Sequence, residues 1–75
     1  MTMTQSAFLT AYEFQLMARY EWARNPDKLS RFLDSCERTL KGASAWNHDG
    51  DAVTAAWRTI GGKGKPTLKA LRGLA

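Results

Sequence analysis

Residues 25–42 read NPDKLSRFLDSCERTLKG, and this stretch decides the fold of the 75-residue chain. Asn25 is a typical N-cap, Pro26 suits the first helical position, and an acid follows near the positive end of the helix dipole. Gly42 suits the left-handed position that ends a helix. Apolar residues recur between them at the spacing of one helical face: Leu29, Phe32, Leu33, Cys36 and Leu40. The stretch therefore predicts an amphipathic helix over residues 26–41.

The residues before this helix predict another over about 5–24, joined to it by a short turn that favours antiparallel packing. At about 100° per residue, one wide apolar stripe is formed by Phe8, Leu9, Tyr12, Leu16, Tyr20 and Ala23. After a polar connection that contains Trp46, apolar spacing places shorter helices at about 51–61 and 66–74. No segment alternates with the period of a strand. We therefore expect an all-α fold, a compact bundle of three to four helices in a single domain, 1–75.

Several classes of protein and site are disfavoured by composition. Cys36 is the only cysteine, so no disulfide forms within one chain. Cys36 and His48 supply two ligands where structural zinc wants four, and the acids beside His48 lack the spacing of a calcium loop. We expect no metal, no cofactor, no catalytic residue and no enzymatic activity. No apolar run approaches the roughly 20 residues that span a bilayer, and no signal peptide is evident. These features predict a cytoplasmic protein without a membrane partner.

Positive charge is concentrated in the last third of the chain. The net charge is +4, but residues 1–51 carry six bases and seven acids, whereas residues 52–75 carry five bases and no acid. The five are Arg58, Lys63, Lys65, Lys69 and Arg72. A segment of one sign favours contact with phosphate. We expect these side chains to form a nucleic-acid-binding surface, with a basic surface that serves a protein partner, or no specific partner, as the alternative.

Residues 53–74 resemble a helix-turn-helix unit, in which the second helix enters the DNA major groove. The matching positions are Ala56, Ile60, Gly61, Leu68 and Leu71. The turn is about one residue longer than usual, and the second helix offers Lys69 and Arg72 but no Asn, Gln or Ser for base edges. The resemblance therefore implies contact with phosphates more than reading of sequence. This segment contains a glycine loop, residues 61–65. The loop lacks the preceding strand and the glycine spacing of a nucleotide-binding loop.

A second apolar stripe runs along the first predicted helix through Ala11, Phe14, Ala18 and Trp22, with Met17 at its edge. The stripe is either a second side of the core or a surface that meets another molecule. Exposed apolar patches usually mark partner sites, and alanines between aromatics allow close helix approach. Phe14, Met17, Ala18 and Trp22 are thus the candidate partner interface, used by a different protein or by a second copy in a homodimer.

In its brevity, its tryptophan content and its basic helical tail over residues 64–72, the chain is similar to small proteins encoded by bacteriophages and prophages. That resemblance implies one of two roles. The first is a small DNA-binding regulator, and the second is an accessory protein that docks on a host protein and blocks or redirects it.

Overall fold

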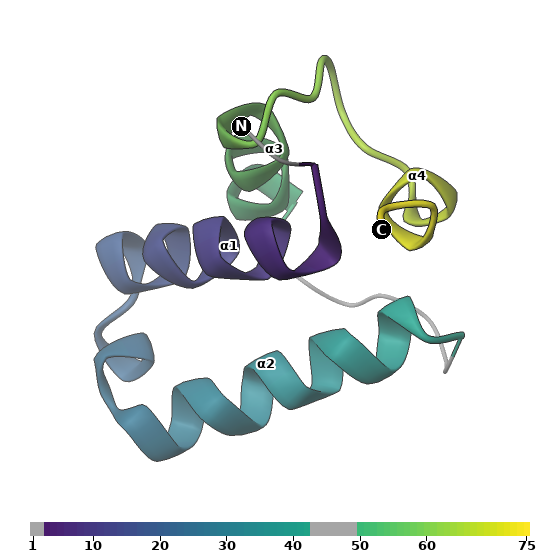
Figure 1. Ribbon diagram of the computed structural model, residues 1–75. Helices are drawn as coiled ribbons and strands as arrows, with labels where there is room; N and C mark the ends of the chain where they lie inside the picture. The colour runs from purple at the N-terminus through teal and green to yellow at the C-terminus, as the bar shows by residue number, and fades with distance from the viewer. Residues whose placement is uncertain (1–2, 43–49) are drawn as a thin grey trace.

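The computed structural model describes residues 3–42 and 50–75, and the described chain is helical without a strand (Figure 1). Its elements are α1 (Gln5–Arg19), the 3-10 turn η1 (Glu21–Arg24), α2 (Pro26–Leu40), α3 (Gly50–Thr59) and α4 (Leu68–Arg72). The predicted all-α bundle is confirmed. Trp46 and His48, which the sequence placed in a polar connection, lie outside the described residues.

The α2 helix forms where its sequence predicts and ends one residue earlier, at Leu40. The Asn25 side chain accepts hydrogen bonds from the backbone N–H groups of Asp27 and Lys28, at 3.0 and 3.2 Å. A cap of this kind stabilises a helix by about 1 kcal/mol. Gly42 follows the helix with a φ of 101°, the left-handed value expected of a terminating glycine.

The α1 helix is shorter than the predicted 5–24, because the chain leaves the helical conformation at Tyr20. That residue is extended, with φ −127° and ψ 132°, and the single turn η1 follows it. The Tyr20 ring stacks on Trp22 at 5.8 Å between centroids, and Trp22 packs on Phe32 of α2 at 5.2 Å. These ring contacts stabilise the extended conformation of Tyr20 that separates α1 from η1. The contact to Phe32 joins two elements, so helical periodicity could not predict it.

Two glycines end α3 at Thr59, two residues before the predicted boundary. Gly61 has a φ of 105°, and its N–H donates to the Arg58 carbonyl at 3.1 Å. The Gly62 N–H donates to the Trp57 carbonyl at 2.9 Å. This pair of bonds is a Schellman motif, which satisfies carbonyls that otherwise lack helical partners.

The α4 helix covers Leu68–Arg72 where the sequence predicted 66–74. Thr67 is extended, and its hydroxyl accepts a hydrogen bond from the Ala70 N–H at 3.1 Å. Thr67 is therefore the N-cap, and Pro66 lies before the helix instead of at its first position. Gly73 then closes the helix through its bond to the Lys69 carbonyl.

The core lies where α1 meets α2 and α3. In Figure 1, α1 lies between α3 and α2, and α4 lies above the C-terminal end of α2. The largest fully buried side chains are Tyr12, Phe8, Leu16 and Cys36. The start of α1 lies beside Ala75, because the Gln5 N–H donates to the Ala75 oxygen at 3.0 Å. None of the described helices is long and apolar enough to cross a lipid bilayer.

Candidate functional site

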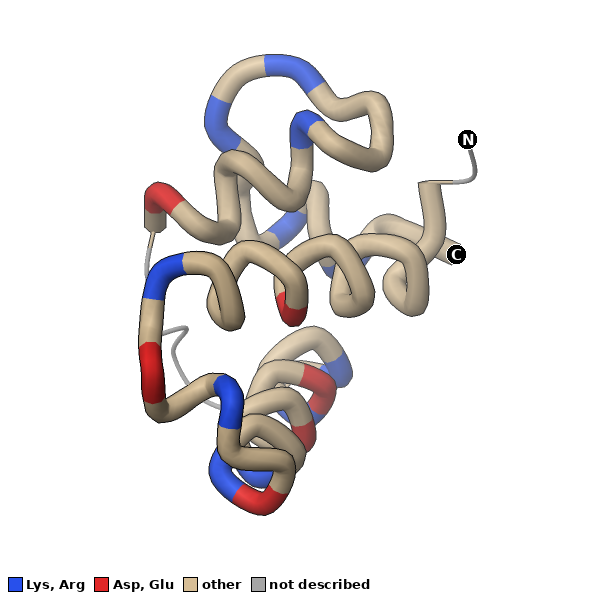
Figure 2. Tube along the Cα trace, turned by 90° about the vertical axis from the view of Figure 1, so that its left-hand side faces the viewer, with Lys and Arg blue, Asp and Glu red and all other residues tan. Residues whose placement is uncertain are grey.

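The basic residues expected to contact nucleic acid follow one another along the end of α3, the loop and α4. Arg58, Lys63, Lys65, Lys69 and Arg72 are all exposed. Figure 2 shows blue positions in the loop that joins α3 to α4, which are Lys63 and Lys65, and no acid in that loop. Within residues 3–42 and 50–75, no carboxylate forms an ion pair with the first four of these side chains. Their positive charge is therefore not neutralised by the described part of the fold.

Trp57 packs against the glycine loop that follows α3, residues 61–65. Its indole Nε1 donates to the Lys63 carbonyl at 3.1 Å. The ring also lies directly over Gly62, where an added Cβ would collide with the indole. These two contacts hold the backbone of the loop at Gly62 and Lys63. The sequence placed Trp57 only on the inner face of its helix, although an aromatic residue four positions before a Gly-Gly pair was a signal for this contact.

Arg72 differs from the other four bases because its guanidinium is used within the fold. Its Nε and Nη2 donate to the Thr39 carbonyl at 3.2 and 3.0 Å. Thr39 lies in the last turn of α2, where the helix dipole favours a cation, and its carbonyl also accepts the Gly42 N–H at 3.1 Å. Arg72 thus ties α4 to α2. The sequence could not indicate this role, since the two residues are 33 positions apart.

The geometry of α3 and α4 differs from a compact helix-turn-helix unit. The connection runs from residue 60 to residue 67, and α4 has five residues. A helix of that length extends about 7.5 Å, which leaves little room for side chains on successive base edges. The exposed lysines of the loop are therefore better suited to phosphate oxygens than to base recognition.

The predicted partner stripe is divided between α1 and η1. Phe14 is 65% exposed and Ala18 is exposed, whereas Met17 is partly buried against the core. Trp22 is 36% exposed but lies beyond the end of α1. Ala11, at the other end of the stripe, is buried. The four interface candidates are consequently not one continuous helical face, and Phe14 is the most exposed of them.

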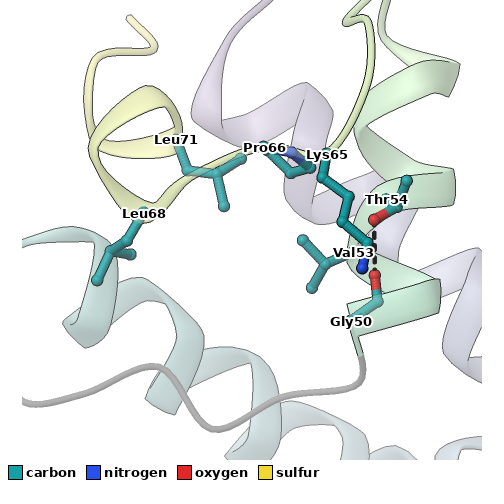
Figure 3. Close-up of a pocket in the computed structure, with 7 residues that line it drawn as sticks. All are labelled: Gly50, Val53, Thr54, Lys65, Pro66, Leu68 and Leu71. Atoms are coloured by element: carbon teal, nitrogen blue, oxygen red, sulfur yellow. Dashed lines mark hydrogen bonds between the residues drawn. The ribbon is translucent and has the colours of Figure 1, made fainter.

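A hollow of about 230 Å³ lies between α3, the loop and α4 (Figure 3). It is lined by Gly50, Val53, Thr54, Lys65, Pro66, Leu68 and Leu71. The Lys65 side chain points across it toward the start of α3, where the Thr54 hydroxyl donates to the Gly50 carbonyl at 2.8 Å. Among the described residues that line the hollow, Lys65 is the only titratable one, so they supply no acid–base pair.

The thiol of Cys36 is chemically shielded. The side chain is fully buried in α2, and desolvation by that burial raises the pKa of the thiol to about 12. Thiolate is the nucleophilic form of cysteine, and it is scarce at neutral pH when the pKa is high. Elsewhere in the described residues, no three His, Cys, Asp or Glu side chains gather as a metal site would require.

Comparisons of the chain with protein-family models, with curated proteins and with solved structures give no match. A role for the protein must therefore be inferred from its own surfaces. Two of them stand out: the uncompensated bases around the α3–α4 loop, and the exposed ring of Phe14 on α1.

Proposed function

We propose that this protein is a small non-enzymatic binding protein that contacts the phosphate backbone of nucleic acid. The contact uses the basic segment, defined as Arg58, Lys63, Lys65 and Lys69. The observation that carries the proposal is that these four exposed bases form no ion pair with any carboxylate in residues 3–42 and 50–75, while residues 52–75 contain no acid. Contacts of this kind bind many sequences alike, because phosphates carry no sequence information.

Such a role suits a cytoplasmic regulator of the type that bacteriophages and prophages encode. If two copies of the chain associate, their two basic segments are held at a fixed separation, as in dimeric operator-binding proteins. The five-residue α4 favours a protein that holds or coats nucleic acid over one that reads a site.

Affinity for duplex DNA is expected to fall steeply with salt. Four neutralised phosphates correspond to a slope of about −3.6 in log affinity against log salt concentration. Fluorescence anisotropy of a labelled duplex, titrated with the full chain at several salt concentrations, measures this slope. A protein that retains neither duplex nor single-stranded nucleic acid at low salt would refute the proposal.

Paired charge variants locate the contact. Lys63→Gln/Lys65→Gln is expected to reduce the magnitude of the slope by about 1.8, since two phosphate contacts are lost. Lys28→Gln/Lys41→Gln removes the same charge from α2 and is expected to leave the slope unchanged. Equal slopes for the two double variants would show that overall charge, and not the basic segment, causes binding.

The second candidate function is protein interaction, as an inhibitor or as a self-associating module, through Phe14. The observation that favours it is the 65% exposure of this large apolar ring in the middle of α1, because exposed apolar area commonly marks a partner site. The partner we test is a second copy of the chain.

Phe14→Ser is expected to abolish self-association in sedimentation equilibrium while the melting temperature stays within a few degrees of the parent protein. Phe8→Ser is the matched change on the same helix, and because Phe8 is fully buried it is expected to unfold the chain. A parent protein that is monomeric at high concentration would exclude the homodimer.

A further inference from the structure

A long groove runs between α1 and α2. It consists of a hollow of about 480 Å³ beside η1 and another of about 360 Å³ near the start of α1. Glu13, Leu33 and Glu37 line both hollows, so the two adjoin each other along α1 and α2. All of the lining residues belong to α1, α2, η1 or the positions adjoining them, and neither α3 nor α4 contributes to this face.

The floor of the groove is apolar. Leu9, Met17 and Leu33 are only partly buried, and each of them packs one side against the core. In a helical bundle, side chains in this position are normally covered by another helix. Here α3 packs most closely on α1, and its residues are absent from the lining of the groove. The described fold therefore leaves an apolar strip open along two helices.

The rim of the groove carries acids in its middle and bases at its ends. Glu13 of α1 faces the groove from one wall, and Asp34 and Glu37 of α2 from the other. In the part of the chain that the structure describes, none of the three carboxylates forms an ion pair. Arg24 lines one end, where its Nε donates to the Met17 carbonyl at 3.4 Å, and Lys41 lines the other.

We propose that this groove binds a basic amphipathic helix of a partner protein. Apolar side chains of the partner would cover Leu9, Met17 and Leu33, and its Lys or Arg residues would approach Glu13 and Glu37. Helix-in-groove recognition uses this combination of an apolar floor and spaced anchors. The lining of α1 runs from Gln5 to Met17, a length of about 18 Å that suits a helix of three to four turns.

Charge complementarity selects this occupant over a second copy of the chain. A symmetric dimer through the groove would place the Glu13 and Glu37 carboxylates of both copies against each other, which repels. The whole chain carries +4, so its general field does not attract a cationic partner. Attraction must then come from the local carboxylates. The inference is independent of nucleic-acid contact, which concerns the other side of α1.

A labelled synthetic peptide of about 14 residues tests the groove. In this helical peptide, leucines follow helical spacing on one face and lysines flank them. The control is a scrambled peptide of the same composition, which has no apolar face. We expect saturable one-to-one binding of the first peptide, and binding of the second at least about tenfold weaker. Backbone amide shifts on binding should concentrate at Leu9, Met17 and Leu33. Equal binding of the two peptides would overturn the proposal.

Matched variants keep the test independent of folding. Glu13→Gln/Glu37→Gln is expected to weaken binding of the helical peptide about fivefold, while Glu21→Gln/Asp27→Asn removes the same charge outside the groove and is expected to leave binding unchanged. Equal losses for the two double variants would contradict the proposal. The proposal would also be contradicted if the parent chain self-associated and Glu13→Gln/Glu37→Gln abolished that self-association. The groove would then be occupied by a second copy of the chain.

Discussion

Replacing Gly62 with alanine is expected to lower the free energy of unfolding by about 3 kcal/mol. The added methyl group would collide with the Trp57 ring, which lies directly over the glycine. The indole cannot move away without losing its bond to the Lys63 carbonyl. A shift of the backbone instead would break the bond from the Gly62 N–H that closes α3. Every way of relieving the collision therefore costs a contact that holds the loop.

Urea denaturation of Gly62→Ala beside Gly50→Ala measures this effect. Gly50 begins α3 with no atom near its would-be Cβ and no left-handed φ, so alanine is expected to be neutral or stabilising by up to about 1 kcal/mol. In a Trp57→Ala background, Gly62→Ala is expected to cost much less, because the colliding ring is gone. If Gly62→Ala were as stable as the parent protein, the contact between Trp57 and Gly62 would be disproved.

Stability is expected to decrease as the pH rises above about 9, through Cys36. The ordinary pKa of the thiol is 9.0, and burial raises the folded-state pKa to about 12. Below pH 9 both states keep the proton, so the contribution of the buried thiol is fully present. Between the two values only the unfolded chain releases the proton, which favours unfolding by about 1.4 kcal/mol per pH unit. Over the whole window the loss approaches roughly 4 kcal/mol.

Cys36→Ala isolates this dependence, because it removes the thiol and leaves every other ionisable group in place. Urea denaturation of both proteins at pH 8, 9 and 10 is expected to give a steeper decline for the parent. The same shielding predicts that iodoacetamide modifies Cys36 only after unfolding. Parallel declines in the two proteins would mean that the thiol titrates normally in the folded state.

Much of the fold was predictable because its signals are local. Asn25 and Gly42 bracket α2, and both adopt the capping geometry that their residue types favour. The end of α1 was not predictable, because the extended Tyr20 stacks on Trp22, which in turn packs against Phe32 of another element. Apolar periodicity continued through this break, so the sequence predicted a single longer helix.

The surfaces were predictable in composition but not in arrangement. The exposure of Lys63 and Lys65 followed from their position in a glycine loop. The internal bond of Arg72 to Thr39 did not, since it depends on how α4 sits against α2. The groove between α1 and α2 was not predictable from the sequence either. Its acids are spread over both helices, and they face a common strip only after the two helices pack.

The bond between the Gln5 N–H and the Ala75 oxygen makes the backbone almost a closed ring. One of the free amides at the start of α1 finds its acceptor at the opposite terminus, beside the end of α4. Head-to-tail ligation through a short flexible linker is therefore compatible with the native packing. Cyclisation would lower the conformational entropy of the unfolded chain and so stabilise the native state. A domain this small, whose burial is limited by its size, would gain proportionally more than a larger one.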